Sequence, residues 1–109
     1  MREGIYIVSL QAGAIKGLII GSLCKGAITG CDRTHFVTGR YKQNGNRLSG
    51  NFAFRRHTKR PDLAEIANLD EFEVQFTGIG GDGFGEIHSA VPGNPSQNVK
   101  ATFRWLCAF

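Results

Sequence analysis

The chain has 109 residues, of which 41% are hydrophobic and 20% charged, and its net charge is +4. This composition suits one globular domain over residues 1–109 and excludes a coiled coil, a disordered tail and a separate cofactor-binding domain. No apolar run approaches the roughly 18 residues that cross a membrane as a helix, so we expect no membrane span.

The chain starts with a short apolar run that admits two interpretations. Residues 4–10 follow Arg2 and precede small residues at 12–14, an arrangement that also begins secretory signal peptides. The run is short for such a signal and equally fits a first β-strand. We favour the strand, and with it a cytoplasmic protein.

Apolar and polar residues alternate along most of the chain, which predicts antiparallel β-strands. The alternation is strictest at residues 71–77 and recurs at residues 99–107. Eight strands are expected, at residues 4–10, 15–23, 27–31, 35–42, 47–57, 71–79, 83–90 and 99–107.

Glycine-containing turns are expected between several of these strands. The Asn44-Gly45 pair indicates a tight hairpin, because both residue types tolerate a positive φ. The glycine-rich stretch 78–85 indicates a second hairpin, since no helix follows it to complete a phosphate-binding loop.

Two connections are longer. Residues 61–70 place Leu63, Ile66 and Leu69 at three-residue spacing, which predicts a short helix or a loop that plugs or flanks the sheet. Residues 92–96 are expected to form a loop, because neither of their prolines can donate a hydrogen bond within a central strand pair.

Eight consecutive antiparallel strands can close into an up-and-down barrel, which leaves no exposed sheet edge. The predicted fold is therefore an all-β barrel of eight strands with one short helix or loop after the fifth. Such a barrel is filled by its own side chains or holds one small ligand. Six aromatic residues share the face expected to line the interior, as core or as ligand contacts: Phe52, Phe54, Phe72, Phe76, Phe103 and Trp105.

The sequence contains no recognisable catalytic motif. It lacks a nucleophile elbow, a phosphate-binding loop and a zinc-protease helix motif, so we expect no enzymatic activity, metal or cofactor. Cys24, Cys31 and His35 are spaced unlike any zinc site. Together with Cys107 there are three cysteines, which cannot all pair within one chain, and free thiols fit a reducing cytoplasm.

Two groups of residues are candidates for surface contacts. One is a basic patch that is either a solvated strand end or a contact for phosphate or nucleic acid, made of Arg40, Arg55, Arg56, Lys59 and Arg60. The other is an apolar strand face at Val37 and Tyr41, opposite in parity to Phe36, which is a candidate face for a homodimer.

Four segments carry a resemblance to a known family. They are Arg2-Glu3-Gly4-Ile5-Tyr6-Ile7-Val8, Lys16-Gly17-Leu18-Ile19-Ile20, Lys25-Gly26-Ala27-Ile28-Thr29-Gly30-Cys31-Asp32 and Phe36-Val37-Thr38-Gly39-Arg40-Tyr41. In order and spacing they resemble the GrlR family of negative regulators of type III secretion, more loosely as far as Arg56-His57. The similarity covers roughly the first half of the chain, mostly in turn glycines and strand apolar residues.

The resemblance implies a cytoplasmic, dimeric, lipocalin-like β-barrel that binds and inhibits a transcriptional activator without catalysis. The family's enteric regulators carry an acidic stretch in the hairpin that corresponds to residues 42–46, where this chain has no acidic residue. For that reason no partner-binding residue is transferred to this chain.

Three functions remain open from the sequence. The first is a regulator of a transcriptional activator, and the second is a small barrel that holds a lipid or another apolar ligand among its inward aromatic residues. The third, nucleic-acid binding through the basic patch, is disfavoured because the net charge is moderate and spread along the chain.

Overall fold

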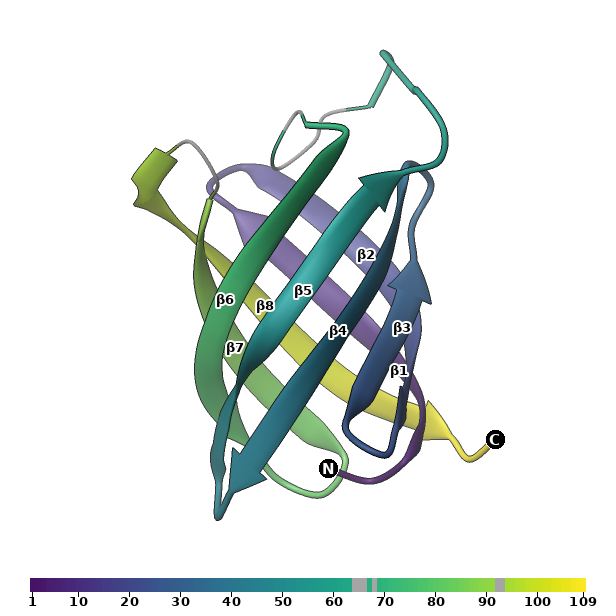
Figure 1. Cartoon of the computed structure of the whole chain (residues 1–109), viewed down its shortest axis with the longest axis vertical. Helices are drawn as coiled ribbons and strands as arrows, with labels where there is room; N and C mark the ends of the chain where they lie inside the picture. The colour runs from purple at the N-terminus through teal and green to yellow at the C-terminus, as the bar shows by residue number, and fades with distance from the viewer. Residues whose placement is uncertain (64–66, 68, 92–93) are drawn as a thin grey trace.

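The chain forms one closed antiparallel β-barrel in which each strand pairs with the next and the last pairs with the first (Figure 1). This computed structural model describes residues 1–63, 67, 69–91 and 94–109, with backbone only at 91 and 94–96. The strands are β1 (Gly4–Ala12), β2 (Ile15–Cys24), β3 (Ala27–Cys31), β4 (His35–Asn44), β5 (Arg47–Arg56), β6 (Glu71–Gly80), β7 (Phe84–Val91) and β8 (Asn94–Cys107). The all-β, eight-stranded, up-and-down architecture expected from the alternating pattern is confirmed.

The largest difference from the expected strands lies at β8, which begins at Asn94 and includes Pro95. The prediction of a loop through residue 96 was wrong. The register moves from Ala90 opposite Asn98 to Val91 opposite Asn94, so Pro95 falls among residues that have no partner in register. A proline is tolerated there because an irregular stretch does not need its missing N–H.

The connection from β5 to β6 is a loop wherever the structure describes it. Pro61, Asp62 and Leu63 form a turn and a bend, and Leu69 is irregular. Ile66, the central residue of the expected helical pattern, lies outside the described residues. No helix occurs among the described residues, so the loop alternative fits them.

The hairpin expected near Asn44 is present, with a shifted centre. Asn44 pairs with Arg47, so the two turn residues are Gly45 and Asn46. Gly45 has a φ of 64°, and a glycine with positive φ at the first turn position matches the right-handed twist of the two strands.

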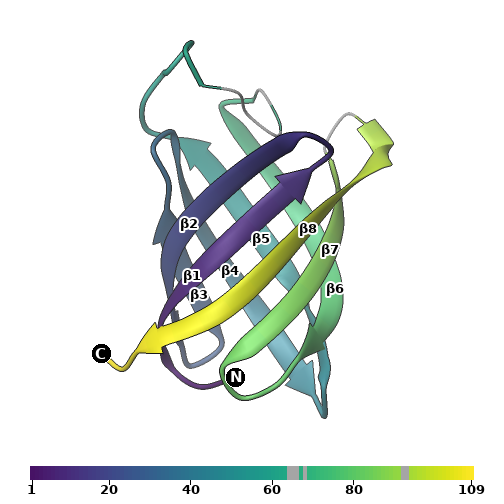
Figure 2. The same ribbon diagram turned by 180° about the vertical axis from the view of Figure 1, so that it is seen from behind.

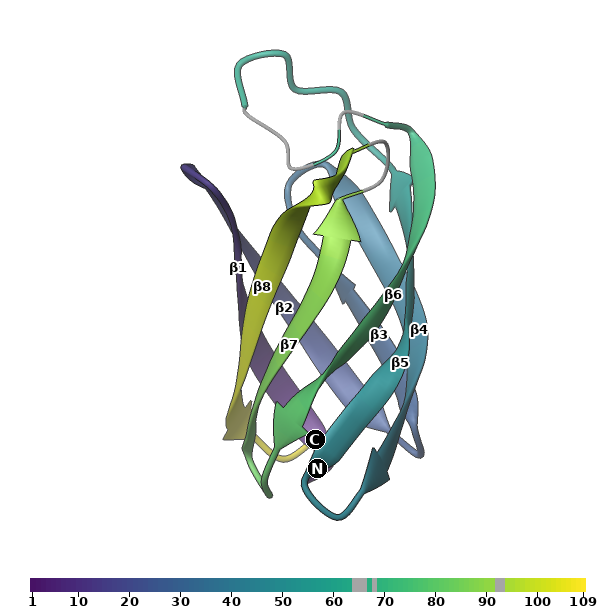
Figure 3. The same ribbon diagram turned by 90° about the vertical axis from the view of Figure 1, so that its left-hand side faces the viewer.

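One end of the barrel, which we name the terminal end, carries both chain termini and three hairpin turns (Figures 1 and 3). At this end the guanidinium of Arg2 bonds Asp82 at 2.6 Å and lies 4.4 Å from the ring centre of Trp105. The amino group of Met1 donates to the side-chain carbonyl of Gln43. The opposite end, which we name the loop end, carries the β5–β6 loop (Figure 3).

The interior is filled by inward side chains from all eight strands, with Ile28 of β3 partly buried against the core. The buried core consists of Tyr6, Ile19, Leu23, Val37, Leu48, Phe52, Phe76, Ile87, Ala101 and Phe103. Two phenylalanines lie opposite glycines of the neighbouring strand: Phe52 faces Gly39 and Phe76 faces Gly50. Because a glycine has no Cβ atom, each phenylalanine ring has room to pack over the glycine opposite it.

We predict that the folded protein loses stability between pH 10 and pH 12 through Tyr6. Burial, with a smaller effect of Tyr41, raises the pKa of Tyr6 from 10.0 to about 12, while its hydroxyl donates to the carbonyl of Arg2 at 2.5 Å. The stabilisation is complete below pH 10 and is lost as pH rises, at about 1.4 kcal/mol per pH unit. Urea unfolding across this range measures the slope. The Tyr6→Phe variant is expected to lack this component, and an identical slope in both proteins would contradict the assignment.

Candidate functional site

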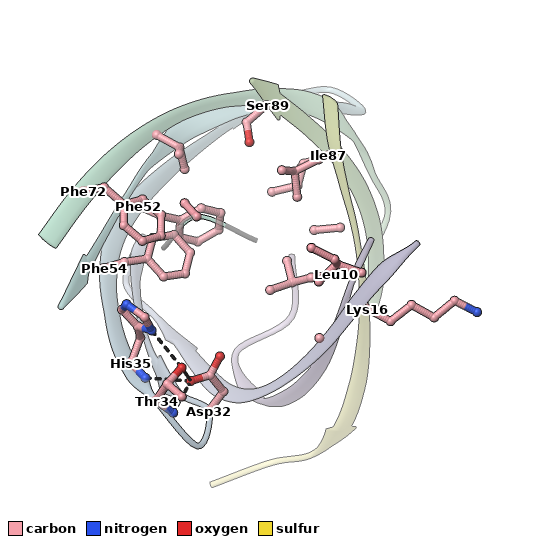
Figure 4. A pocket seen from close by; sticks show the side chains of 16 residues that line it. Leu10, Lys16, Asp32, Thr34, His35, Phe52, Phe54, Phe72, Ile87 and Ser89 are labelled. Atoms are coloured by element: carbon pink, nitrogen blue, oxygen red, sulfur yellow. Dashed lines mark hydrogen bonds between the residues drawn. The ribbon is translucent and has the colours of Figure 1, made fainter. Parts of the chain in front are cut away.

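The barrel holds an apolar cavity of about 100 Å³ toward the loop end. Figure 4 shows Phe52, Phe54 and Phe72 along one wall and Leu10 and Ile87 on the opposite side. A second pocket of about 40 Å³ lies deeper and shares Leu10, Phe52 and Phe54 with the first. These three side chains therefore separate two parts of one apolar interior.

Aromatic stacking fixes the wall of the cavity. The rings of Phe54 and Phe72 are stacked with centres 4.6 Å apart and an angle of 9° between their planes. Phe52 stacks on Phe76 at 4.7 Å and meets Phe54 edge-on at 6.0 Å. Stacked and edge-on pairs add to the free energy of burial, so the wall presents defined ring faces to the cavity.

Three polar residues at the rim, Asp32, Thr34 and His35, are bonded to one another and to backbone. One carboxylate oxygen of Asp32 accepts from the backbone N–H of Thr34 at 2.8 Å and of His35 at 2.7 Å. The Nε2 of His35 lies 2.9 Å from the carbonyl of Leu69, and since a carbonyl only accepts, Nε2 carries the hydrogen. Nδ1 lies 2.8 Å from the hydroxyl of Thr34, which also lies 3.2 Å from the same carboxylate oxygen of Asp32. These three residues are held by hydrogen bonds to one another and to backbone. The rest of the lining is mainly apolar and includes two further polar residues, Lys16 and Ser89.

The same rim anchors the loop over the open end. His35 bonds Leu69, and the backbone N–H of His57 donates to the carbonyl of Thr34 at 2.8 Å. Arg56 bonds the carboxylate of Asp70 at 2.7 Å. The described parts of the β5–β6 loop are thus attached at both ends to the strands around the cavity.

The six aromatic residues predicted from the sequence fall into three environments. Phe52, Phe54 and Phe72 line the main cavity. Phe76 and Phe103 are buried in the core, and Phe103 also lines the deeper pocket. Trp105 packs partly against the core at the terminal end, where its ring N–H donates to the carbonyl of Glu3 at 3.2 Å. Trp105 therefore lies away from the cavity.

The predicted basic patch is divided in the structure. Arg56 pairs with Asp70 and Arg60 with Asp62, both at 2.7 Å, and these hydrogen bonds lower the pKa values of the two carboxyl groups. Arg55 lies opposite Glu71 on β6, and Lys59 is exposed in the following loop. Arg40 lies farther along β4, where it is paired with Asn51, so the five side chains do not form one surface.

The predicted dimer face was wrong, because its side chains point inward. Val37 is 3% exposed, and Tyr41 packs against the core. Phe36, which the sequence placed inside, is 40% exposed. The register of the β4–β5 hairpin determines which side chains of β4 point inward. Val37 lies opposite Phe54 and Tyr41 lies opposite Gly50, and Phe54 and Gly50 are both on the inward face of β5.

Apolar side chains that were not predicted to be exposed lie on the outside of the barrel. Ile20 and Phe84 are 47% and 62% exposed. On the face shown in Figure 2, Ile20 of β2 pairs with Ile7 of β1, Ile7 with Arg104 of β8, and Arg104 with Phe84 of β7. The sequence does contain one indication of this surface. The run Leu18-Ile19-Ile20 is apolar on both faces of its strand, so at least one apolar side chain must point outward.

The three cysteines differ from His35 in their exposure to solvent. Cys24, Cys31 and Cys107 are free and exposed, whereas His35 is buried. Across the described residues, no three His, Cys, Asp or Glu side chains form a group that could hold a metal ion.

The fold and the cavity together define an eight-stranded, lipocalin-like up-and-down β-barrel. No protein-family model and no curated protein matches the chain. The described part of the chain contains no helix long and apolar enough to cross a membrane.

Proposed function

We propose that this protein binds one small apolar ligand inside the barrel, without catalysis. The observation that carries the proposal is the cavity at the loop end. Its aromatic wall is ordered by stacking, and Asp32, Thr34 and His35 at its rim are hydrogen-bonded to one another and to backbone. The cavity lies toward the loop end of the barrel, so a ligand enters from that end.

The size of the cavity limits the ligand. An apolar cavity of about 150 Å³ holds a benzene molecule in another protein, and this one measures about 100 Å³ with about 40 Å³ beyond Leu10. A single aromatic ring or the end of an acyl chain fits these dimensions. A bulky polycyclic molecule does not.

Ligand-induced stabilisation tests the proposal. We expect toluene or octanoate to raise the midpoint of thermal unfolding, because a ligand at a hundred times its Kd stabilises the folded state by about 2.7 kcal/mol. Val74→Phe and Ser89→Leu add volume inside the cavity, and both variants are expected to lose the shift.

The matched control is Gln75→Leu, which adds an apolar side chain on the outer face of the same strand as Val74. It is expected to keep the shift. Two cavity-filling variants are used because, if one of them folds poorly, the other still tests the proposal. Equal shifts in a folded cavity-filling variant and in the control would overturn the proposal.

A second candidate is a GrlR-like regulator that binds a transcriptional activator and forms a homodimer in the cytoplasm. The exposed side chains of Ile20 and Phe84 support it. They lie on one outer face with the half-buried Ile7 and the exposed Arg104, and exposed apolar side chains favour protein contacts. The three exposed free cysteines suit a reducing compartment.

This candidate predicts co-purification of a transcription factor with the tagged protein from its native host. It also predicts a dimer by light scattering, which Ile20→Glu should dissociate. A monomer at high concentration, together with no co-purified activator, would remove it.

A further inference from the structure

We propose that a basic groove on the outside of the barrel, formed by Lys25, Arg40 and Lys42, binds an extended acidic segment of another protein. The groove crosses the outer surfaces of β4, β5 and β6, which lie side by side in Figure 1. It lies outside the barrel wall, so the proposal is independent of a ligand in the interior.

Strand pairing brings the three cations together from separate parts of the chain. Arg40 and Lys42 are both exposed and lie two residues apart on the outer face of β4. Lys25 lies in the β2–β3 turn, which is joined to β4 by a hydrogen bond of 3.0 Å from the N–H of Tyr41 to the carbonyl of Gly26. The turn is a tight two-residue hairpin turn, in which Lys25 has a φ of 51° and Gly26 a φ of 76°.

The groove contains positive charge that is not neutralised by acidic residues within it. Its described lining contains no carboxylate, and no ion pair is formed by Lys25, Arg40 or Lys42 with any residue in the described ranges. Glu3 lies at one margin, where it accepts from the backbone N–H of Lys25, and Glu86 lies at the other, bonded to His88. The three side chains are therefore available to an anionic partner.

The floor of the groove adds neutral hydrogen-bonding groups. Asn51 of β5 lies opposite Arg40 on one side and opposite Gln75 of β6 on the other. Ser49 and Thr77 form the adjacent row. Amide and hydroxyl groups of this kind bond both carboxylate oxygens and peptide groups.

The spacing of the cations favours an extended peptide. Residues two apart on a strand are separated by about 6.8 Å, the same distance as alternate side chains of an extended peptide. A closed barrel offers no free edge for strand addition, so the partner must be recognised through side chains. A peptide with acidic residues at alternate positions can meet both Arg40 and Lys42.

A single-stranded nucleic acid is less well matched to this groove. Proteins that bind such strands combine basic grooves with exposed aromatic faces for base stacking. The aromatic residues of this groove are Tyr41 and Phe76. Tyr41 is half-buried against the core and Phe76 is 3% exposed, so neither offers a free ring face.

NMR titration of the ¹⁵N-labelled protein at low salt tests the proposal. The probe is a peptide of alternating glutamate and serine, compared with its glutamine counterpart and with an oligothymidylate of equal charge. We expect the acidic peptide to shift the side-chain amide signals of Asn51 and Gln75. The charge-reversing double variant Arg40→Glu, Lys42→Glu is expected to bind it about tenfold more weakly or worse.

The matched control is the double variant Arg55→Glu, Lys59→Glu, which changes the net charge equally outside the groove. It is expected to bind within about threefold of the unmodified protein, since distant charges act mainly on the association rate. The proposal is overturned if the control loses as much affinity, if the neutral peptide binds equally, or if the acidic peptide does not bind. Tighter binding of the oligothymidylate at the same signals would also overturn it, in favour of a nucleic-acid surface.

Discussion

Replacing Phe76 by alanine is expected to lower the free energy of unfolding by about 3–5 kcal/mol, because a buried phenylalanine leaves a cavity that the barrel cannot close. Phe76 is 3% exposed and stacks on Phe52 at 4.7 Å. Natural domains have about 5–15 kcal/mol of stability in total, so this single change removes a large share. Urea unfolding of the two proteins measures the difference.

The control for this prediction is the same substitution at Phe84, which is 62% exposed on the outer face. Surface changes generally alter stability by about 0.5 kcal/mol or less. Similar losses at Phe76 and Phe84 would mean that the ring stack inside the barrel contributes little to folding.

The second large effect is expected for Gly50→Ala. A Cβ at Gly50 would lie 2.1 Å from the carbonyl oxygen of Arg40 and 2.7 Å from the ring of Phe76. The backbone oxygen of Arg40 cannot move away without breaking the β4–β5 pairing. Overpacking usually lowers the free energy of unfolding by roughly 1–3 kcal/mol, and for Gly50→Ala we expect a decrease at or above the upper end of this range. The midpoint and slope of urea unfolding report the change.

Gly17 supplies the matched control for Gly50. A Cβ at Gly17 would meet the side chain of Leu10 at 3.6 Å, an ordinary contact. Gly17→Ala is expected to be tolerated. If both alanine variants are equally stable, the close approach of β4 and β5 at Gly50 is not a constraint on this fold.

The fold was predictable because the alternation of apolar and polar residues defines the strands, and closure of eight such strands into a barrel leaves no sheet edge exposed. Strict alternation at residues 71–77 identified β6, and the Asn-Gly signal identified the β4–β5 turn. With eight such segments joined mostly by short turns, a barrel is the arrangement that removes both sheet edges. No long-range information was needed for this step.

The parity of β4 was not predictable from β4 alone. Both faces carry apolar residues, with Phe36 on one and Val37 on the other, so alternation gives no answer there. The two-residue turn at Gly45 and Asn46 sets the register that places Val37 beside Phe54. Because a shift by one residue turns every side chain to the other face, the turn decides which residues are buried.

The two candidate sites were predictable to different extents. Phe54 and Phe72 were assigned to the interior from alternation alone, but their stacking and the cavity beside them depend on the closed barrel. The basic groove was missed because Lys25 and Lys42 are distant in sequence, and pairing of the β2–β3 turn with β4 joins them. The partner of Arg56 was also hidden, since Asp70 returns to it only through a long loop.

We propose that the cavity beside Phe54 binds an apolar ligand, and nuclear Overhauser contacts between bound toluene and the protein test this proposal most directly. We predict contacts from the toluene protons to Leu10, Phe54 and Phe72, which surround the cavity. Contacts only to the outward side chains of Leu18 and Phe84, or none at saturating toluene, would contradict a ligand site inside the barrel.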